Sequence, residues 1–153
     1  MIRNFYSATR CWTCIWRSFN ITAIRYICFG YTSSLLVAAS LNYVPGLTDN
    51  EGRALGIFAL DVFDDSLHFF SALWALIAGL LSHRAAQIFL IYFGTLYFSD
   101  GFLGLITGSG YLDFGIFNYG IQDLAFMFKI LNNLPHLALG GFALFSIWVW
   151  DHK

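Results

Sequence analysis

Four apolar stretches, each of about the length that crosses a hydrocarbon core, make up most of this sequence. A transmembrane helix needs about 20 predominantly apolar residues. Only 11% of the 153 residues are charged, whereas soluble domains carry about 25%. A soluble core of this size could not cover the 58% of residues that are hydrophobic. We therefore expect an all-α integral membrane protein, a four-transmembrane-helix bundle with spans at residues 26–44, 64–81, 85–107 and 134–150.

The basic residues predict how this bundle is oriented. With four spans, both termini and the turn between the second and third spans lie on one side of the membrane. The opposite side holds only Arg53 and Lys129. Because cytoplasmic loops carry an excess of Lys and Arg, we expect both termini to be cytoplasmic. The basic residues on that side are Arg3, Arg10, Arg17, Arg25, Arg84 and Lys153.

The first 25 residues form a segment of their own, ahead of a single membrane domain at residues 26–150. The first three arginines are seven residues apart, so they share one face of a helix. Trp12, Trp16 and Phe19 form a second stripe. This pattern predicts a basic amphipathic helix at residues 1–25 that lies in the membrane interface.

Two longer loops connect the spans on the outer side of the predicted bundle. Each holds a short amphipathic stretch, residues 54–63 in the first loop and 123–131 in the second, which we expect to cap the outer face. The second span is short. Its helix is expected to begin a turn earlier, near Asp64 and Asp65, since negative charge is favoured at a helix N-terminus. Pro135 is expected in the first turn of the fourth span, where proline is tolerated.

Two histidines lie near the starts of the second and fourth spans. His68 follows Asp64 by four residues, and His136 follows Asn132 by four. An imidazole within a span is costly unless it is paired or faces the bundle interior. At this helical spacing the Asp64 carboxylate or the Asn132 amide can bond the ring one turn later and hold one tautomer.

The histidine pair has several interpretations. The favoured one is structural, with hydrogen bonds from His68 and His136 joining the spans. The alternatives are axial ligation of a haem from two helices, and a proton relay from the outer face. Two histidines supply too few ligands for a closed zinc site, so no metal is predicted.

Asp100 is the only acidic residue well inside an apolar stretch. One interpretation is that it faces His68 or His136 from the third span and is paired there. The other is that Ser99 to Gly101 interrupts the helix near the outer interface, where the carboxylate reaches water. Both remain open at this point.

Glycines within the spans predict close contacts between helices, because small residues let membrane helices approach one another. We assign this packing role to Gly79, Gly94, Gly101, Gly140 and Gly141.

The two halves of the sequence show a weak internal repeat. Residues 27–30 match residues 91–94 at an offset of 64, and His68 matches His136 at an offset of 68. Each half holds two spans, so the halves keep one orientation and would be related by an axis along the membrane normal. Chance similarity between apolar helices is the alternative to this two-fold repeat.

The polar motifs resemble those of domain-of-unknown-function family 4383, small four-span bacterial membrane proteins. Residues 64–68 (Asp-Asp-Ser-Leu-His) and 132–136 (Asn-Asn-Leu-Pro-His) fit its repeated Asn/Asp-x-x-x-His element, and residues 43–46 (Tyr-Val-Pro-Gly) fit its first turn. The resemblance covers residues 25–150 and implies a multi-pass protein of the bacterial cytoplasmic (inner) membrane, with no assigned activity. The Arg-rich start makes the mitochondrial inner membrane the alternative location.

These observations favour a membrane protein without catalytic activity, a structural or accessory subunit of a larger membrane assembly. Its expected partners are the lipid bilayer and other membrane subunits, or a second copy of itself. A net charge of −1 argues against a nucleic-acid partner. The alternative is a redox or proton-handling membrane protein that uses haem, quinone or metal at His68 and His136.

Overall fold

The computed structural model describes residues 22–50, 53–58 and 62–150. Within these ranges the chain is helical, with turns and isolated bridges but no β-strand, which confirms the all-α class. Residues 1–21 lie outside the described residues, so the interfacial helix stays a prediction. The elements are α2 (Ala23–Ser40), the 3-10 helix η1 (Leu41–Tyr43), α3 (Val62–Leu81), α4 (His83–Thr107), α5 (Gly115–Tyr119) and α6 (Phe126–Trp150).

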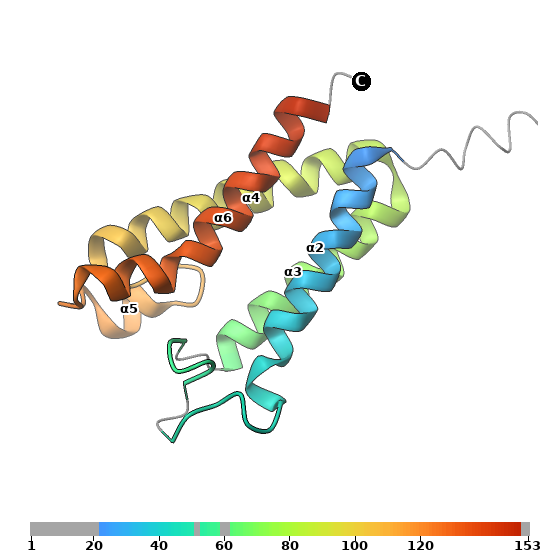
Figure 1. Ribbon diagram of the computed structural model, residues 1–153. Helices are drawn as coiled ribbons and strands as arrows, with labels where there is room; N and C mark the ends of the chain where they lie inside the picture. The colour runs from blue at the N-terminus through green and yellow to red at the C-terminus, as the bar shows by residue number, and fades with distance from the viewer. Residues whose placement is uncertain (1–21, 51–52, 59–61, 151–153) are drawn as a thin grey trace, which may run out of the picture.

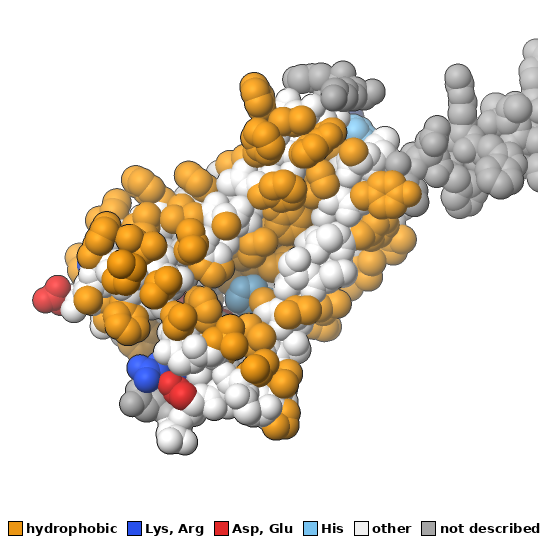
Figure 2. All heavy atoms as spheres, viewed as in Figure 1, with side chains coloured by type: hydrophobic (Ala, Val, Ile, Leu, Met, Phe, Trp, Pro, Cys, Tyr) orange, Lys and Arg blue, Asp and Glu red, His pale blue; other side chains and the backbone are white. Residues whose placement is uncertain are grey.

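Three described helical segments have the length and composition to cross a membrane. α3 is not among them, because Asp64, Asp65 and His68 lower its mean hydropathy. α3 begins at Val62, which confirms that its helix starts ahead of the apolar run. Figure 2 shows hydrophobic side chains over most of the visible face, as expected of a membrane protein. The three segments are Ala23–Tyr43, His83–Thr107 and Phe126–Trp150.

The long helices form two pairs (Figure 1). α2 packs along α3, and α4 packs along α6. The start of α2, the turn between α3 and α4 and the end of α6 lie together, and we call this the terminal end. The loop after η1 and the segment around α5 lie at the opposite end, which we call the loop end.

An aromatic column on α4 fills the space between the two pairs. The Phe93 ring stacks on Tyr97 at a centroid distance of 4.1 Å and on Phe89 at 5.1 Å. Tyr31 from α2 meets the Phe93 ring edge-on at 5.0 Å. The Tyr31 hydroxyl donates a hydrogen bond of 2.5 Å to the carbonyl of Leu139 on α6. This contact ties the first pair to the second.

Hydrogen bonds from α2 close the terminal end. The Arg25 guanidinium donates to the carbonyls of Gly79 and Leu80 at 2.7 and 3.0 Å. These are among the last carbonyls of α3, which have no partner within their own helix. The Thr22 hydroxyl lies 2.9 Å from Nδ1 of His83 at the start of α4. Arg25 therefore has a structural role beside the topological one predicted for its charge.

α4 runs without a break through Ser99, Asp100 and Gly101, so the predicted interruption is wrong. The Ser99 hydroxyl bonds back to the carbonyl of Thr95 at 2.6 Å, which satisfies it within the helix. Gly101 is needed for packing, because a Cβ there would lie 2.9 Å from Leu137 of α6. The small residue in this stretch therefore allows α4 to pack against α6, and the helix does not end here.

α6 begins at Phe126, well before the predicted start of the fourth span. The predicted amphipathic stretch at residues 123–131 and the span thus belong largely to one helix. Pro135 lies in the interior of α6 and not in its first turn, which corrects the prediction. The helix continues there because proline removes only one backbone hydrogen bond, and membrane helices tolerate this loss.

The amphipathic stretch predicted at residues 54–63 does not form a continuous helix in the part that the structure describes. Residues here form tight turns, with isolated bridges that join Ala54 to Thr48 and to Phe58. Leu55 and Gly56 have positive φ angles of 56° and 71°. This left-handed backbone is incompatible with a continuous helix.

Candidate functional site

A cavity of about 340 Å³ opens at the loop end, between the two helix pairs. Figure 2 shows a histidine side chain within a hollow on this face of the molecule. Six elements contribute to the cavity wall: α2, η1, α3, α4, α5 and α6. The cavity brings together all five site residues predicted from the sequence and one more acid. Its polar lining includes Asp64, His68, Asp100, Asp113, Asn132 and His136.

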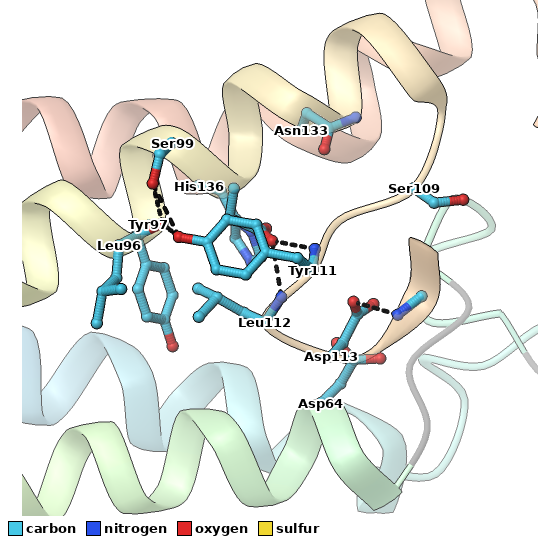
Figure 3. Close-up of polar contacts among 12 residues, drawn as sticks. Asp64, Leu96, Tyr97, Ser99, Ser109, Tyr111, Leu112, Asp113, Asn133 and His136 are labelled. Carbon is cyan, nitrogen blue, oxygen red and sulfur yellow. Dashed lines mark hydrogen bonds and ion pairs between the residues drawn. The ribbon is translucent and has the colours of Figure 1, made fainter. Parts of the chain in front are cut away.

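The Asp100 carboxylate forms hydrogen bonds with the segment after α4 and with α6 (Figure 3). Its side chain is buried in α4, with the residue only 1% exposed. One carboxylate oxygen accepts from the backbone N–H groups of Tyr111 and Leu112, at 2.5 and 2.9 Å. The other lies 2.6 Å from Nδ1 of His136. Of the two interpretations of Asp100, pairing with a histidine is therefore confirmed, and exposure to water is wrong.

The bond to Asp100 determines which nitrogen of His136 faces the cavity. A carboxylate accepts, so Nδ1 of His136 donates and Nε2 is left for other partners. Asn132 does not hold this ring, contrary to the prediction from helical spacing. Its Oδ1 atom is buried and has no partner among the described residues. His136 bonds Asp100 of α4 instead of Asn132 of its own helix, because α4 and α6 approach closely at their glycines.

His68 is held within its own helix. Nδ1 lies 2.8 Å from the backbone carbonyl oxygen of Asp64, and since a carbonyl only accepts, Nδ1 is the donor. The predicted bond to the Asp64 carboxylate is wrong, because the carbonyl one turn earlier is within reach and the carboxylate lines the cavity. The residue is only 6% exposed, yet Nε2 of His68 has no hydrogen-bond partner among the described residues.

The two imidazole rings meet across the helix pairs. The ring centroids of His68 and His136 lie 6.2 Å apart, with 60° between the ring planes. Tyr97 packs beside both, at 5.0 Å from His136 and 6.4 Å from His68. The Tyr97 hydroxyl lies 3.2 Å from the Ser71 hydroxyl, away from the imidazole nitrogens. Both rings thus keep one nitrogen bonded to the protein and one available to the cavity.

Metal ligation requires more side chains than the histidine pair. Among the described residues, no group of three or more His, Cys, Asp or Glu side chains is arranged to hold a metal ion. Haem ligation by His68 and His136 stays a prediction.

The segment that follows α4 was missed by sequence reasoning. It lies against the helix through the two N–H groups that bond Asp100 and through the Tyr111 hydroxyl, which donates to the Leu96 carbonyl at 2.9 Å. Asp113 comes from this segment, where its carboxylate accepts from the N–H of Gly115 at 2.9 Å. A sequence does not show which backbone N–H groups will donate to a side chain. The only sequence signal for this segment was an acidic residue, Asp113, in a glycine-rich loop.

A second polar contact also escaped prediction. Asp65 is 7% exposed and accepts from the amide of Asn42 at 3.2 and 3.4 Å, which joins α3 to η1. The equivalent position in α6, Asn133, is also buried, and its amide donates to the Lys129 carbonyl at 2.8 Å. The second member of each polar pair thus makes a structural hydrogen bond, and Asn133 also lines the cavity beside His136.

No family model, no curated protein and no solved structure matches this chain.

Proposed function

We propose that this chain is a four-span integral membrane protein that binds a small molecule in the cavity between its two helix pairs. The proposal is carried by the Nε2 atoms of His68 and His136, which belong to cavity-lining rings and lack hydrogen-bond partners among the described residues. A histidine that joins two spans would bond a group on another helix. His68 bonds only its own helix, so cross-linking does not account for it.

The surface of α3 supports its role as a membrane span, the second of the four in chain order. This helix has 20 residues, and a helix of that length extends about 30 Å, the thickness of a hydrocarbon core. Phe70, Leu80 and Leu81 are exposed by 65%, 61% and 71% in the isolated chain. Lipid contact would cover these side chains. The carboxylates that lower its hydropathy lie in the first turn, where a span meets the headgroups.

Four spans place both termini on one side, which the excess of basic residues identifies as the cytoplasm. The proposed location is the bacterial cytoplasmic membrane, with the mitochondrial inner membrane as the alternative. The resemblance to family 4383 is compatible with this placement and stays a prediction.

A two-fold internal repeat is part of the proposal. Each half supplies one antiparallel helix pair, and each pair contributes one histidine to the same cavity. The contact between the rings of His68 and His136 is what an axis along the membrane normal would produce. The binding site then lies at the interface between the repeats.

We favour a non-catalytic role, as a ligand-binding accessory subunit among other membrane proteins or copies of itself. Proton handling is the second candidate, because the Asp100 carboxylate, His136 and His68 form a continuous polar series at the cavity. The two roles differ in one readout: only the second moves protons across a sealed liposome.

Asparagine variants of the two histidines test the binding role. The Asn amide nitrogen occupies the place of Nδ1, so His68→Asn and His136→Asn keep the donor and remove Nε2. We expect each to weaken the binding of hits from a small-molecule fragment library about tenfold, the effect of one lost hydrogen bond. Binding is measured by saturation-transfer NMR on purified protein in detergent.

The matched control is His83→Asn, which changes a histidine at the terminal end. It should bind fragments as the unmodified protein does. If the unmodified protein binds none, or if the His83 variant loses binding equally, the cavity is not a ligand site. Thermal unfolding of each variant separates lost binding from lost structure.

A further inference from the structure

We infer that the ligand of this cavity is a small amine, a protonated ammonium group on an apolar body. This inference rests on the proposed binding role and specifies its ligand class. The first observation is charge. Asp64, Asp100 and Asp113 line the cavity, and no Lys or Arg does so within the described part of the chain. Such a lining favours a cation and disfavours a carboxylate or phosphate ligand.

The second observation is the character of the available polar atoms. In their neutral rings, Nε2 of His68 and Nε2 of His136 are acceptors, since each Nδ1 is the donor. The Asn132 Oδ1 atom is a third acceptor, buried and without a partner among the described residues. Because a buried acceptor left unsatisfied is costly, a ligand donor that bonds Asn132 Oδ1 would be favoured.

Two side-chain amides of the cavity wall each donate a hydrogen bond to a backbone carbonyl. The Asn133 amide donates to the Lys129 carbonyl at 2.8 Å, and the Gln122 amide donates to the Tyr119 carbonyl at 2.6 Å. The acceptors that lack a partner among the described residues are then Nε2 of His68, Nε2 of His136 and Oδ1 of Asn132. An ammonium group has three N–H donors and no acceptor, which is the complement of this set.

The third observation is the apolar part of the wall. Ala38, Leu41, Phe58 and Pro135 line the cavity beside the acids. A volume of about 340 Å³ suits a molecule of the size of an arylalkyl amine. The ammonium group would lie among the acceptors, and the hydrocarbon part would lie against these side chains.

Three probes of one shape test the charge and the donors separately. Benzylamine, benzyl alcohol and benzoate are each titrated into the purified full-length protein in detergent and followed by calorimetry and saturation-transfer NMR. We expect benzylamine to bind at least tenfold more tightly than benzyl alcohol, and benzoate not to bind. Equal binding of the alcohol and the amine, or preferred binding of benzoate, would overturn the amine assignment and leave the binding role intact.

Variants identify where the amine binds. Asp64→Asn and Asp113→Asn remove a charge while keeping shape and an acceptor oxygen. We expect each to weaken benzylamine binding about fivefold and benzyl alcohol binding by a smaller factor, because only the amine carries a charge. Asp123→Asn, an exposed acid outside the cavity lining, is the matched control and should have no effect. An equal effect of all three variants would mean that the amine responds only to net charge.

The two proposals fail differently. If no probe and no fragment binds, the binding role itself is refuted. If fragments bind but benzylamine does not, only the ligand class is wrong.

Discussion

Asp100 determines the geometry of the cavity. One carboxylate oxygen accepts hydrogen bonds from two N–H groups of the segment after α4, and the other oxygen accepts from Nδ1 of His136. A buried charge is stable only when its hydrogen-bonding capacity is met, as it is here. The same contacts set the tautomer of His136, so one residue links loop position to cavity chemistry.

Substitution of Asp100 tests this role. Asp100→Ala leaves buried donors without an acceptor, and we expect the free energy of unfolding to fall by about 3 kcal/mol. Asp100→Asn should cost less, because its amide oxygen still accepts from Tyr111 or Leu112. Denaturation of the detergent-solubilised protein measures both, with Asp123→Ala as an exposed control that stays near the unmodified value. Equal stability of the Asp100 and Asp123 alanine variants would contradict the assigned role.

The polar residues of the cavity could be predicted from the sequence, but some of their hydrogen-bond partners could not. The burial of Asp100 and its contact with a histidine follow from the cost of a charge inside a span. The partners assigned from helical spacing, the Asp64 carboxylate and the Asn132 amide, were wrong. Spacing identifies neighbours on one helix, whereas contacts across helices depend on how closely the helices approach.

Helix approach is set by glycines, most clearly between α4 and α6. A Cβ on Gly140 would collide with the backbone N–H group of Phe98, and one on Gly104 would overlap the Asn133 amide. A Cβ on Gly141 would lie 3.6 Å from the Phe98 ring, an ordinary van der Waals distance. The sequence predicts that glycines pack between helices. Which of the two adjacent glycines faces α4 depends on the rotation of α6 about its axis, which the sequence does not show.

Alanine substitution of these neighbours is a matched test. Gly140→Ala forces α4 and α6 apart, and we expect it to lower the free energy of unfolding by about 2 kcal/mol. Gly141→Ala gains helix propensity without a clash, so its stability should stay unchanged or rise by about 0.5 to 1 kcal/mol. Thermal unfolding in detergent compares the two. A greater loss for Gly141→Ala would show that the α4–α6 contact is placed wrongly.

The whole molecule consists of two helix pairs with a cavity between their loop ends. The long helices were predictable, because runs of apolar residues directly reflect burial or lipid contact. The start of α6 and the turns after η1 could not be predicted. An amphipathic stretch next to a span can form a separate helix or continue the helix of the span. The cavity depends on those loops and was predicted only through its histidines.

The number of spans decides whether this architecture is correct, and cysteine labelling measures it most directly. Single cysteines replace Asn50, Ser82 and Asp123 in a variant without the native Cys11, Cys14 and Cys28. A membrane-impermeant maleimide is applied to intact cells and to lysed cells. Four spans predict that positions 50 and 123 are labelled in intact cells and position 82 only after lysis. If α3 does not cross, positions 50 and 82 would share one side and position 123 would lie on the other, which would contradict the four-span account.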